Sequence, residues 1–177
     1  METIGILSIL ENQSYKEVKK LWKIFEIKYN SVGVQTFSHP NITLQGGKTE
    51  NLKQLKKCFS EIVPRLKPFE IEVDGYGHFN KKVIYLKVKK TNNLVRLNKL
   101  INQYLEKYCK NLFGYYTPKK WVPHITLAMD DLTEENFERA LSELSKNKIQ
   151  FKQKLHNLCV VKWYPSGKIK IVKKYKL

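Results

Sequence analysis

Two copies of one pentapeptide carry the residues of this chain that are best suited to chemistry. Residues 40–44 read Pro-Asn-Ile-Thr-Leu and residues 123–127 read Pro-His-Ile-Thr-Leu, so the copies differ only in their second residue. Each copy has the pattern of a short strand, and strand alternation puts its second and fourth residues on one face. An imidazole can move a proton near neutral pH, and a threonine hydroxyl can hold a phosphate oxygen. The repeat therefore predicts an internal duplication whose two halves share a site for phosphate chemistry.

Alternating strand and helix patterns indicate the elements that position these motifs. Apolar and alternating runs predict strands, and apolar residues at helical spacing predict helices. Strands are expected at residues 4–10, 40–44, 69–73, 83–88, 123–127, 151–164 and 169–175, and helices at 14–25, 49–62, 94–108 and 133–144. Ser14, Thr49 and Thr133 have side chains that cap helix N-termini, and we expect each to begin a helix.

Glycine-containing segments are expected to separate these elements. Residues 45–47 (Gln-Gly-Gly) and 75–77 (Gly-Tyr-Gly) should end the strands before them, and residues 165–167 (Pro-Ser-Gly) should turn a closing hairpin. No long linker divides residues 1–177. We therefore expect a single α+β domain of two similar lobes, whose antiparallel sheets face a central groove with the helices outside.

Length and composition indicate a folded protein without a membrane span. The chain has 177 residues, of which 42% are hydrophobic, and this is enough for one domain with its own core. No apolar run approaches the roughly 18 residues that a membrane helix needs, and the first residues lack the basic start of a signal peptide. Cys58, Cys109 and Cys159 are scattered and odd in number, which favours a reducing, cytoplasmic compartment without disulfides. No Cys or His pair has metal-ligand spacing, so we expect no metal and no cofactor.

The charge of the chain favours polyanionic partners. Lysine and arginine total 33 against 16 acids, a formal net charge of +17. The excess is uneven, because residues 149–177 carry eight lysines and no acid whereas residues 130–143 carry six acids and one arginine. A coding bias toward Lys, Asn and Ile is an alternative source of the excess. The resulting potential would still attract nucleotides.

With these features, the chain resembles the two-histidine (2H) phosphoesterase superfamily, and within it the 2′-5′ RNA ligase-like, or LigT-like, branch. The resemblance rests on two His-x-Thr-type strands about 80 residues apart in a small α/β chain, and it covers essentially the whole sequence. The second copy matches the family motif fully. The first copy has Asn41 where the family has a histidine. The resemblance implies a bilobal fold in which the two motifs face each other across a groove.

The same resemblance implies metal-independent cleavage of phosphodiesters. In the family, one histidine acts as general base toward water or a ribose hydroxyl, the other protonates the leaving oxygen, and the threonines bind nonbridging phosphate oxygens. On this chain His124 takes a proton-transfer role, and Thr43 and Thr126 are the phosphate ligands. Family substrates include RNA 2′,3′-cyclic phosphates, 2′-5′ linkages and cyclic oligonucleotide signals. The alternative is structural: a hydrogen-bonded histidine at a strand end and two ordinary strand threonines.

Asn41 is the departure that the chemistry must accommodate. An amide cannot exchange protons near pH 7, although it can donate a hydrogen bond to a phosphate oxygen. Three explanations remain open: a naturally degenerate copy in a binding protein, an engineered His→Asn change, or a takeover by His39. Alternation puts His39 on the strand face of Asn41 and Thr43, one step of roughly 6.6 Å away. An exposed histidine before a proline is the plainer alternative for His39.

The loop at residues 114–121 is the expected substrate-binding segment. Tyr115, Tyr116 and Trp121 offer flat faces for a base, and Lys119 and Lys120 offer phosphate contacts. The alternative for Trp121 is a place in the core just before its strand.

The leading interpretation is a metal-independent 2H phosphodiesterase that acts on a nucleotide, a cyclic oligonucleotide or RNA and works as a monomer. One rival is a catalytically impaired relative that binds nucleotides or RNA. Another is a phage enzyme that degrades cyclic nucleotide defence signals.

Overall fold

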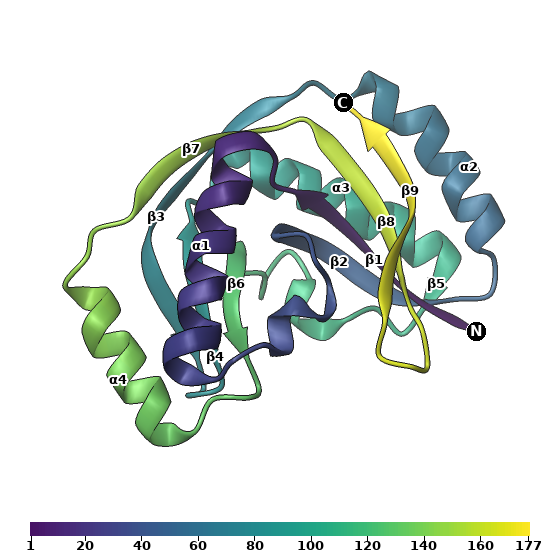
Figure 1. The fold of residues 1–177 in the computed structure, drawn as a ribbon. Coiled ribbons are helices and arrows are strands. Elements are labelled where there is room, and N and C mark those ends of the chain that lie inside the picture. Colours follow the sequence, from purple (N-terminus) through teal and green to yellow (C-terminus); the bar gives the residue numbers. More distant parts are fainter.

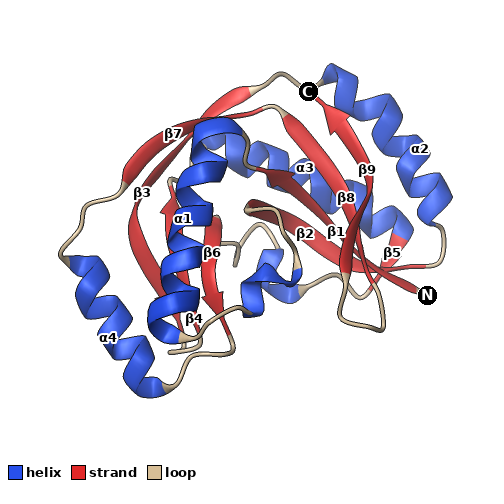
Figure 2. Cartoon of the chain, in the orientation of Figure 1, coloured by secondary structure: helices blue, strands red, loops and turns tan.

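The computed structural model describes all of residues 1–177, which form two antiparallel sheets and four α-helices (Figures 1 and 2). The strands are β1 (Glu2–Ile9), β2 (Asn41–Thr49), β3 (Phe69–Phe79), β4 (Val83–Val88), β5 (Cys109–Lys110), β6 (His124–Met129), β7 (Gln150–Leu155), β8 (Asn157–Trp163) and β9 (Ile169–Lys176). The helices are α1 (Asn12–Tyr29), α2 (Leu52–Ile62), α3 (Asn92–Tyr108) and α4 (Glu134–Ser145), with short 3-10 turns at Gly33–Thr36, Val63–Arg65 and Gly114–Tyr116. None of these helices combines the length and the apolar character that crossing a membrane requires.

The sheets reveal the duplication that the repeated pentapeptide predicts. One sheet has the order β5-β2-β1-β8-β9 and the other the order β6-β4-β3-β7, so β2-β1-β8-β9 corresponds to β6-β4-β3-β7. The halves also exchange elements, because α1 packs against β6 whereas α3 packs against β2 (Figure 1). The predicted α+β fold with two similar antiparallel sheets is confirmed.

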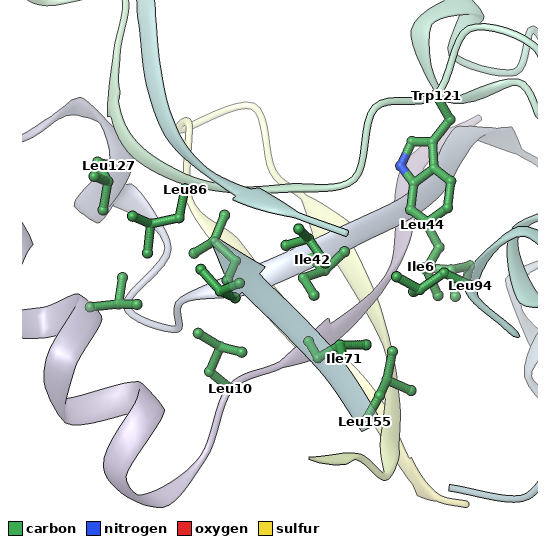
Figure 3. Packing of buried hydrophobic residues seen from close by; sticks show 14 of the residues in the cluster. Ile6, Leu10, Ile42, Leu44, Ile71, Leu86, Leu94, Trp121, Leu127 and Leu155 are labelled. Carbon is green, nitrogen blue, oxygen red and sulfur yellow. The ribbon is translucent and has the colours of Figure 1, made fainter. Parts of the chain in front are cut away.

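The apolar residues of both pentapeptides lie in the core between the sheets. Ile42 and Leu44 from β2, and Ile125 and Leu127 from β6, belong to one cluster of 32 buried residues, part of which Figure 3 shows. Burying a side chain of this size contributes about 1.5–3 kcal/mol. Strand alternation then leaves the Asn or His and the Thr of each copy on the opposite, half-buried face. The core therefore fixes which residues of the motifs are available for chemistry.

Both glycine-containing turn predictions inside strands are wrong. Residues 45–47 continue β2, and residues 75–77 continue β3 past a bulge between Val73 and Tyr76. The glycines are present because aromatic rings occupy the space above them. The Phe113 ring lies 2.5 Å from the position that a Cβ on Gly46 would take, and the Tyr85 ring lies 2.6 Å from the corresponding position on Gly77. Close packing, rather than a turn, explains these residues.

Only one of the three predicted helix caps is confirmed. Thr133 caps α4, since its side chain accepts a hydrogen bond from the Asn136 amide. Ser14 instead lies inside the first turn of α1, whose N-cap is Glu11. Thr49 is the last residue of β2, and the cap of α2 is Asn51. Both misplaced caps are polar residues that the chain buries next to the true helix start.

The closing hairpin is confirmed around residues 165–167, where β8 pairs with β9. The longer strand expected from residue 151 to 164 is divided, because β7 pairs with β3 in the other sheet and β8 pairs with β1. His156 lies between the two, where the chain passes from one sheet to the other.

We predict that Gly46→Ala destabilises the fold. The new methyl group would meet the Phe113 ring at 2.5 Å and the Ile4 carbonyl oxygen at 2.7 Å, and overpacking of this kind costs about 1–3 kcal/mol. The measurement is the free energy of unfolding in urea. Gly114→Ala is the matched control, since a Cβ there has open space around it. An equal loss of stability in both variants would contradict the packing explanation.

Candidate active site

Each motif strand lies at a sheet edge, and an indole from the other half of the chain closes that edge. β6 is the terminal strand of its sheet, and β5 covers only residues 48 and 49 of β2. Trp121 donates its Nε1–H to the Thr43 carbonyl at 3.0 Å, and Trp22 donates its Nε1–H to the Thr126 carbonyl at 2.9 Å. Both indoles are buried. The backbone of each motif threonine is thereby fixed by the opposite half of the molecule.

His124 presents one free ring nitrogen. Its Nδ1 lies 2.7 Å from the Val122 carbonyl oxygen. Because a carbonyl can only accept, Nδ1 carries the proton and Nε2 is left as the base in the neutral ring. Burial lowers the pKa of this imidazole, and the bond to the Val122 carbonyl opposes part of that shift. A half-buried histidine with a free Nε2 and a lowered pKa is suited to accept a proton near neutral pH.

Asn41 repeats the geometry of His124 with an amide. Its Nδ2 donates to the His39 carbonyl at 2.9 Å, which is again the carbonyl two residues earlier in the chain. The Thr43 hydroxyl donates to Asn41 Oδ1 at 3.1 Å. The amide nitrogen of Asn41 thus makes the bond that Nδ1 of His124 makes in the second copy. An imidazole at position 41 would find its backbone acceptor already in place.

Aromatic rings surround His124. Its ring centroid is 5.1 Å from that of Tyr85, 5.2 Å from that of Phe79 and 6.5 Å from that of Tyr116, whose plane is within 21° of parallel. Burial raises the pKa of the Tyr116 phenol, and the nearby Thr43 hydroxyl lowers it in part. Tyr116 therefore lies beside His124 of the second copy and near Thr43 of the first.

Buried amides hold the loop that carries Tyr116. The Asn98 side-chain NH₂ donates both to the Leu44 carbonyl at 2.7 Å and to the Tyr116 carbonyl at 3.1 Å. Asn102 also donates to the Tyr116 carbonyl, at 3.4 Å, and accepts from Gln45 at 2.7 Å. These amides tie α3, the first motif strand and the loop together. Since buried amides are costly to leave unpaired, the network restrains the Tyr116 backbone.

The segment before the first motif is clamped from the end of the second motif strand. The Asp131 carboxylate, two residues after β6, accepts from the Ser31 hydroxyl and from the Val32 and Gly33 amides, each at 2.6 Å. This carboxylate therefore serves the connection between α1 and β2. The same clamp explains part of the acidic cluster at residues 130–143 as structural.

The predicted substrate loop is only partly accessible. Trp121 is 1% exposed, so the prediction that its ring offers a face to a base is wrong: the ring packs in the core and its N–H is used by Thr43. Tyr115 is 85% exposed. Lys119 and Lys120 are exposed and form no ion pair.

His39 lies just outside the motif strand. β2 begins at Asn41, so strand alternation does not extend back to His39 and the prediction of a continuous face there is wrong. The His39 ring instead packs at 5.2 Å from Phe37, and its Nδ1 lies 3.0 Å from the Ser38 hydroxyl. Burial lowers the pKa of this imidazole, and nearby Lys174 and Lys19 lower it further.

Sequence reasoning missed the aromatic residues that line the site. Phe79 and Tyr85 lie on neighbouring strands and reach His124 only through the sheet. Phe113 and Trp163 lie on the face of the first sheet that carries Thr43, with ring centroids 6.2 Å apart. The strand glycines were the available signal, since Gly5, Gly46 and Gly77 each lie beneath one of these rings.

No group of three or more His, Cys, Asp or Glu side chains lies together as a metal site would require. Three surface hollows lie away from the two motifs. The most apolar of them, about 390 Å³, lies between Pro68 and α3, and the other two lie beside His156 and beside Glu50.

Comparisons with known proteins identify the family and the fold. The family model of the 2′-5′ RNA ligase superfamily matches residues 18–166. Among solved structures, TT0787 of Thermus thermophilus has a TM-score of 0.64 at 16% identity, over 99% of this chain and 97% of that one. The MHV ns2 PDE domain has a TM-score of 0.56 at 17% identity, over 98% of this chain and 99% of that one. Both share the fold. None of the curated proteins matches the sequence significantly.

We predict that His124 makes the stability of the protein depend on pH. Because burial holds the folded pKa below the ordinary value of about 6.5, the unfolded chain binds the proton more readily. The free energy of unfolding should therefore fall as the pH falls through about 6.5 and level off below the folded pKa. Urea unfolding at several pH values should show a smaller fall in His124→Gln.

An NMR titration of the His124 ring provides the direct check, and a midpoint at or above about 6.5 would contradict the prediction. His39→Gln is the control, because burial also lowers the pKa of His39. That variant should leave the His124 midpoint in place.

Proposed function

Because the chain belongs to the 2′-5′ RNA ligase superfamily, we propose that it is a phosphodiesterase that acts on nucleotide or RNA substrates without a metal ion. The observation that carries the proposal is the pair of matched hydrogen bonds, from His124 to the Val122 carbonyl and from Asn41 to the His39 carbonyl. In each copy the bond runs from the second residue of the motif to the carbonyl two residues earlier, so both copies hold that residue in the same way. The presence of a PDE domain among proteins of this fold agrees with the proposal.

In the proposed reaction the phosphate binds between Thr43 and Thr126. Their hydroxyls donate to the nonbridging oxygens, and the Asn41 amide adds a further donor. Thr43 gives up its present bond to Asn41 Oδ1 when it turns to phosphate. The Thr126 hydroxyl has no protein partner that it must leave. These fixed donors would stabilise the negative charge that develops on the phosphate oxygens.

His124 is the proposed proton carrier. Its free Nε2 takes the proton from a water or ribose hydroxyl as that oxygen attacks phosphorus, and the bond to the leaving oxygen breaks. In a histidine pair the second imidazole would protonate that leaving oxygen. At position 41 the amide can only donate a hydrogen bond to it, so the proton must come from solvent or from another group such as His39. The expected consequence is slow turnover rather than a different reaction.

The substrate class follows from the surroundings of this site. Tyr116 lies beside His124 and is proposed to contact the sugar or base next to the reacting phosphate. Exposed Tyr115 can stack on a base, and Lys119 and Lys120 can contact a phosphate. RNA 2′,3′-cyclic phosphates, 2′-5′ linked oligonucleotides and cyclic oligonucleotides all present such a phosphate and base.

A second candidate function is nucleotide or RNA binding without turnover. The observation that favours it is Asn41 itself, whose amide is held by the His39 carbonyl and by Thr43 and has no proton to exchange. In this second function the same site binds the diester but does not cleave it.

We predict that Asn41→His raises the rate of diester cleavage by about 10²–10⁴-fold, the usual contribution of a general acid or base. The new ring would donate Nδ1–H to the His39 carbonyl, as Asn41 Nδ2 does, and would present Nε2 to the phosphate. The measurement is hydrolysis of 2′,3′-cyclic nucleotides, 2′-5′ oligonucleotides and cyclic dinucleotides, with EDTA present throughout.

Two variants control this experiment. Asn41→Gln places an amide of histidine-like length at the position and should give no gain, whereas His124→Ala in the Asn41→His chain should abolish it. Rapid cleavage by the unaltered chain, with no loss in His39→Ala, would show that position 41 is not a required proton carrier. Tight substrate binding with no cleavage by any variant would favour the binding function.

A further inference from the structure

The face of the first sheet that carries Thr43 continues as an aromatic surface beyond the motif. On β1, Leu7 pairs with Thr43, Gly5 pairs with Gly46, and Thr3 pairs with Lys48. Leu7, Gly5 and Thr3 alternate onto one face of β1, and a bulge opposite Ile6 and Leu7 puts their partners Thr43, Gly46 and Lys48 in successive rows on that same face. β8 extends the same rows, since Leu7, Gly5 and Thr3 pair with Cys159, Val161 and Trp163.

Two aromatic rings cover the glycine row. The Trp163 ring lies 2.8 Å from the position that a Cβ on Gly5 would take, and the Phe113 ring lies 2.5 Å from the corresponding position on Gly46. Their centroids are 6.2 Å apart and their planes nearly perpendicular, at 83°. Both side chains are only half-buried, so each keeps surface toward solvent. The paired glycines of β1 and β2 thus hold two rings beside the motif.

The position of these rings suits a nucleotide next to the reacting phosphate. At about 3.3 Å per residue, the Gly5 row lies roughly 7 Å along the strand from the row of Thr43, and the Lys48 row lies roughly as far again. A phosphate held by Thr43 does not reach the rings, whereas a base attached to it, or to its neighbour, does. Lys48 then lies where a second phosphate would be.

Charge complementarity at this end of the sheet favours an anionic partner. Lys48 is exposed and has no acidic partner. The two nearby glutamates are already used, because Glu50 pairs with Lys110 at 3.1 Å and Glu2 pairs with Lys162. The net charge of +17 adds a long-range attraction for polyanions.

We propose that Trp163, Phe113 and Lys48 form a second nucleotide subsite, which binds a base by stacking and the following phosphate by its charge. This inference rests on the proposed function, and it names the substrate as single-stranded RNA rather than a mononucleotide. Aromatic rings with a lysine alongside are the usual equipment for holding single-stranded bases. The strand thereby runs from the motif face along β1 toward the end of the β8–β9 hairpin.

Binding measured by calorimetry tests the subsite. The probes are hexauridylate with 2′-O-methyl groups, which lack the attacking hydroxyl, and uridine monophosphate. The variant is Trp163→Leu, which keeps an apolar side chain over Gly5 but removes the aromatic face. Tyr164→Leu is the matched control, because Tyr164 is the next residue and its ring lies under Lys162 and Lys170 instead.

We expect the unaltered chain to bind the hexamer more tightly than the monophosphate. Trp163→Leu should lower that ratio of affinities about fivefold to a hundredfold, the range for one stacked base, and Tyr164→Leu should leave it unchanged. Lys48→Gln should reduce the slope of log affinity against log salt by about 0.7 for the hexamer. An unchanged ratio in Trp163→Leu, at an unchanged urea midpoint, would overturn the proposal.

The outcome is separable from that of the proposed function. Hydrolysis of uridine 2′,3′-cyclic phosphate by the Asn41→His chain reports on the motifs alone. Loss of the hexamer preference in Trp163→Leu without any such hydrolysis would support the subsite and contradict the phosphodiesterase. Hydrolysis by the Asn41→His chain, together with an unchanged hexamer preference in Trp163→Leu, would support the phosphodiesterase and contradict the subsite.

Discussion

The arrangement of the site depends on two indole hydrogen bonds that cross between the halves of the chain. Each motif strand is an edge strand at its threonine, and a carbonyl left there without a donor in a buried place would cost about 1–3 kcal/mol. Trp121 closes the edge at Thr43 and Trp22 closes the edge at Thr126. Because each half supplies the indole for the other, neither motif strand is complete alone. The duplication therefore links the two motif strands through each other's half of the chain.

The polar groups around these strands divide into those that build the site and those left free to act. Asn98, Asn102 and Asp131 hydrogen-bond to backbone groups of the first motif strand and of the loops beside the motifs. The acids of the chain are largely occupied by such clamps or by lysines. The side chains of the two motifs themselves include no acid. This division lets a strongly basic protein keep an ordered site and still present a positive potential to anions.

His124 owes its properties to packing as much as to its own chemistry. Three aromatic rings around it remove water, and this burial is the main reason why its pKa lies below the ordinary range. Asn41 occupies the matching position and makes the matching bond to the backbone, but its amide does not ionise near neutral pH. The two copies thus keep one geometry while they differ in proton chemistry. On the first sheet, aromatic packing also brings Phe113 against Trp163.

The sequence by itself determined the duplication, the α+β class, the four helices, most of the strands and the pair of motifs, because each rests on local periodicity and on a repeat of five residues. It did not predict β5 or the division of residues 151–164 into β7 and β8. It misjudged Gly46 and Gly77 as turns, Trp121 as a ligand platform and His39 as part of the motif strand. Those errors share one cause: each residue is decided by a ring, carbonyl or strand end that lies far away in the sequence. Only the tertiary structure brought Trp22 to Thr126, Tyr85 to His124 and Trp163 to Gly5. Local patterns can state which face a side chain takes, but what covers that face depends on the pairing of distant strands.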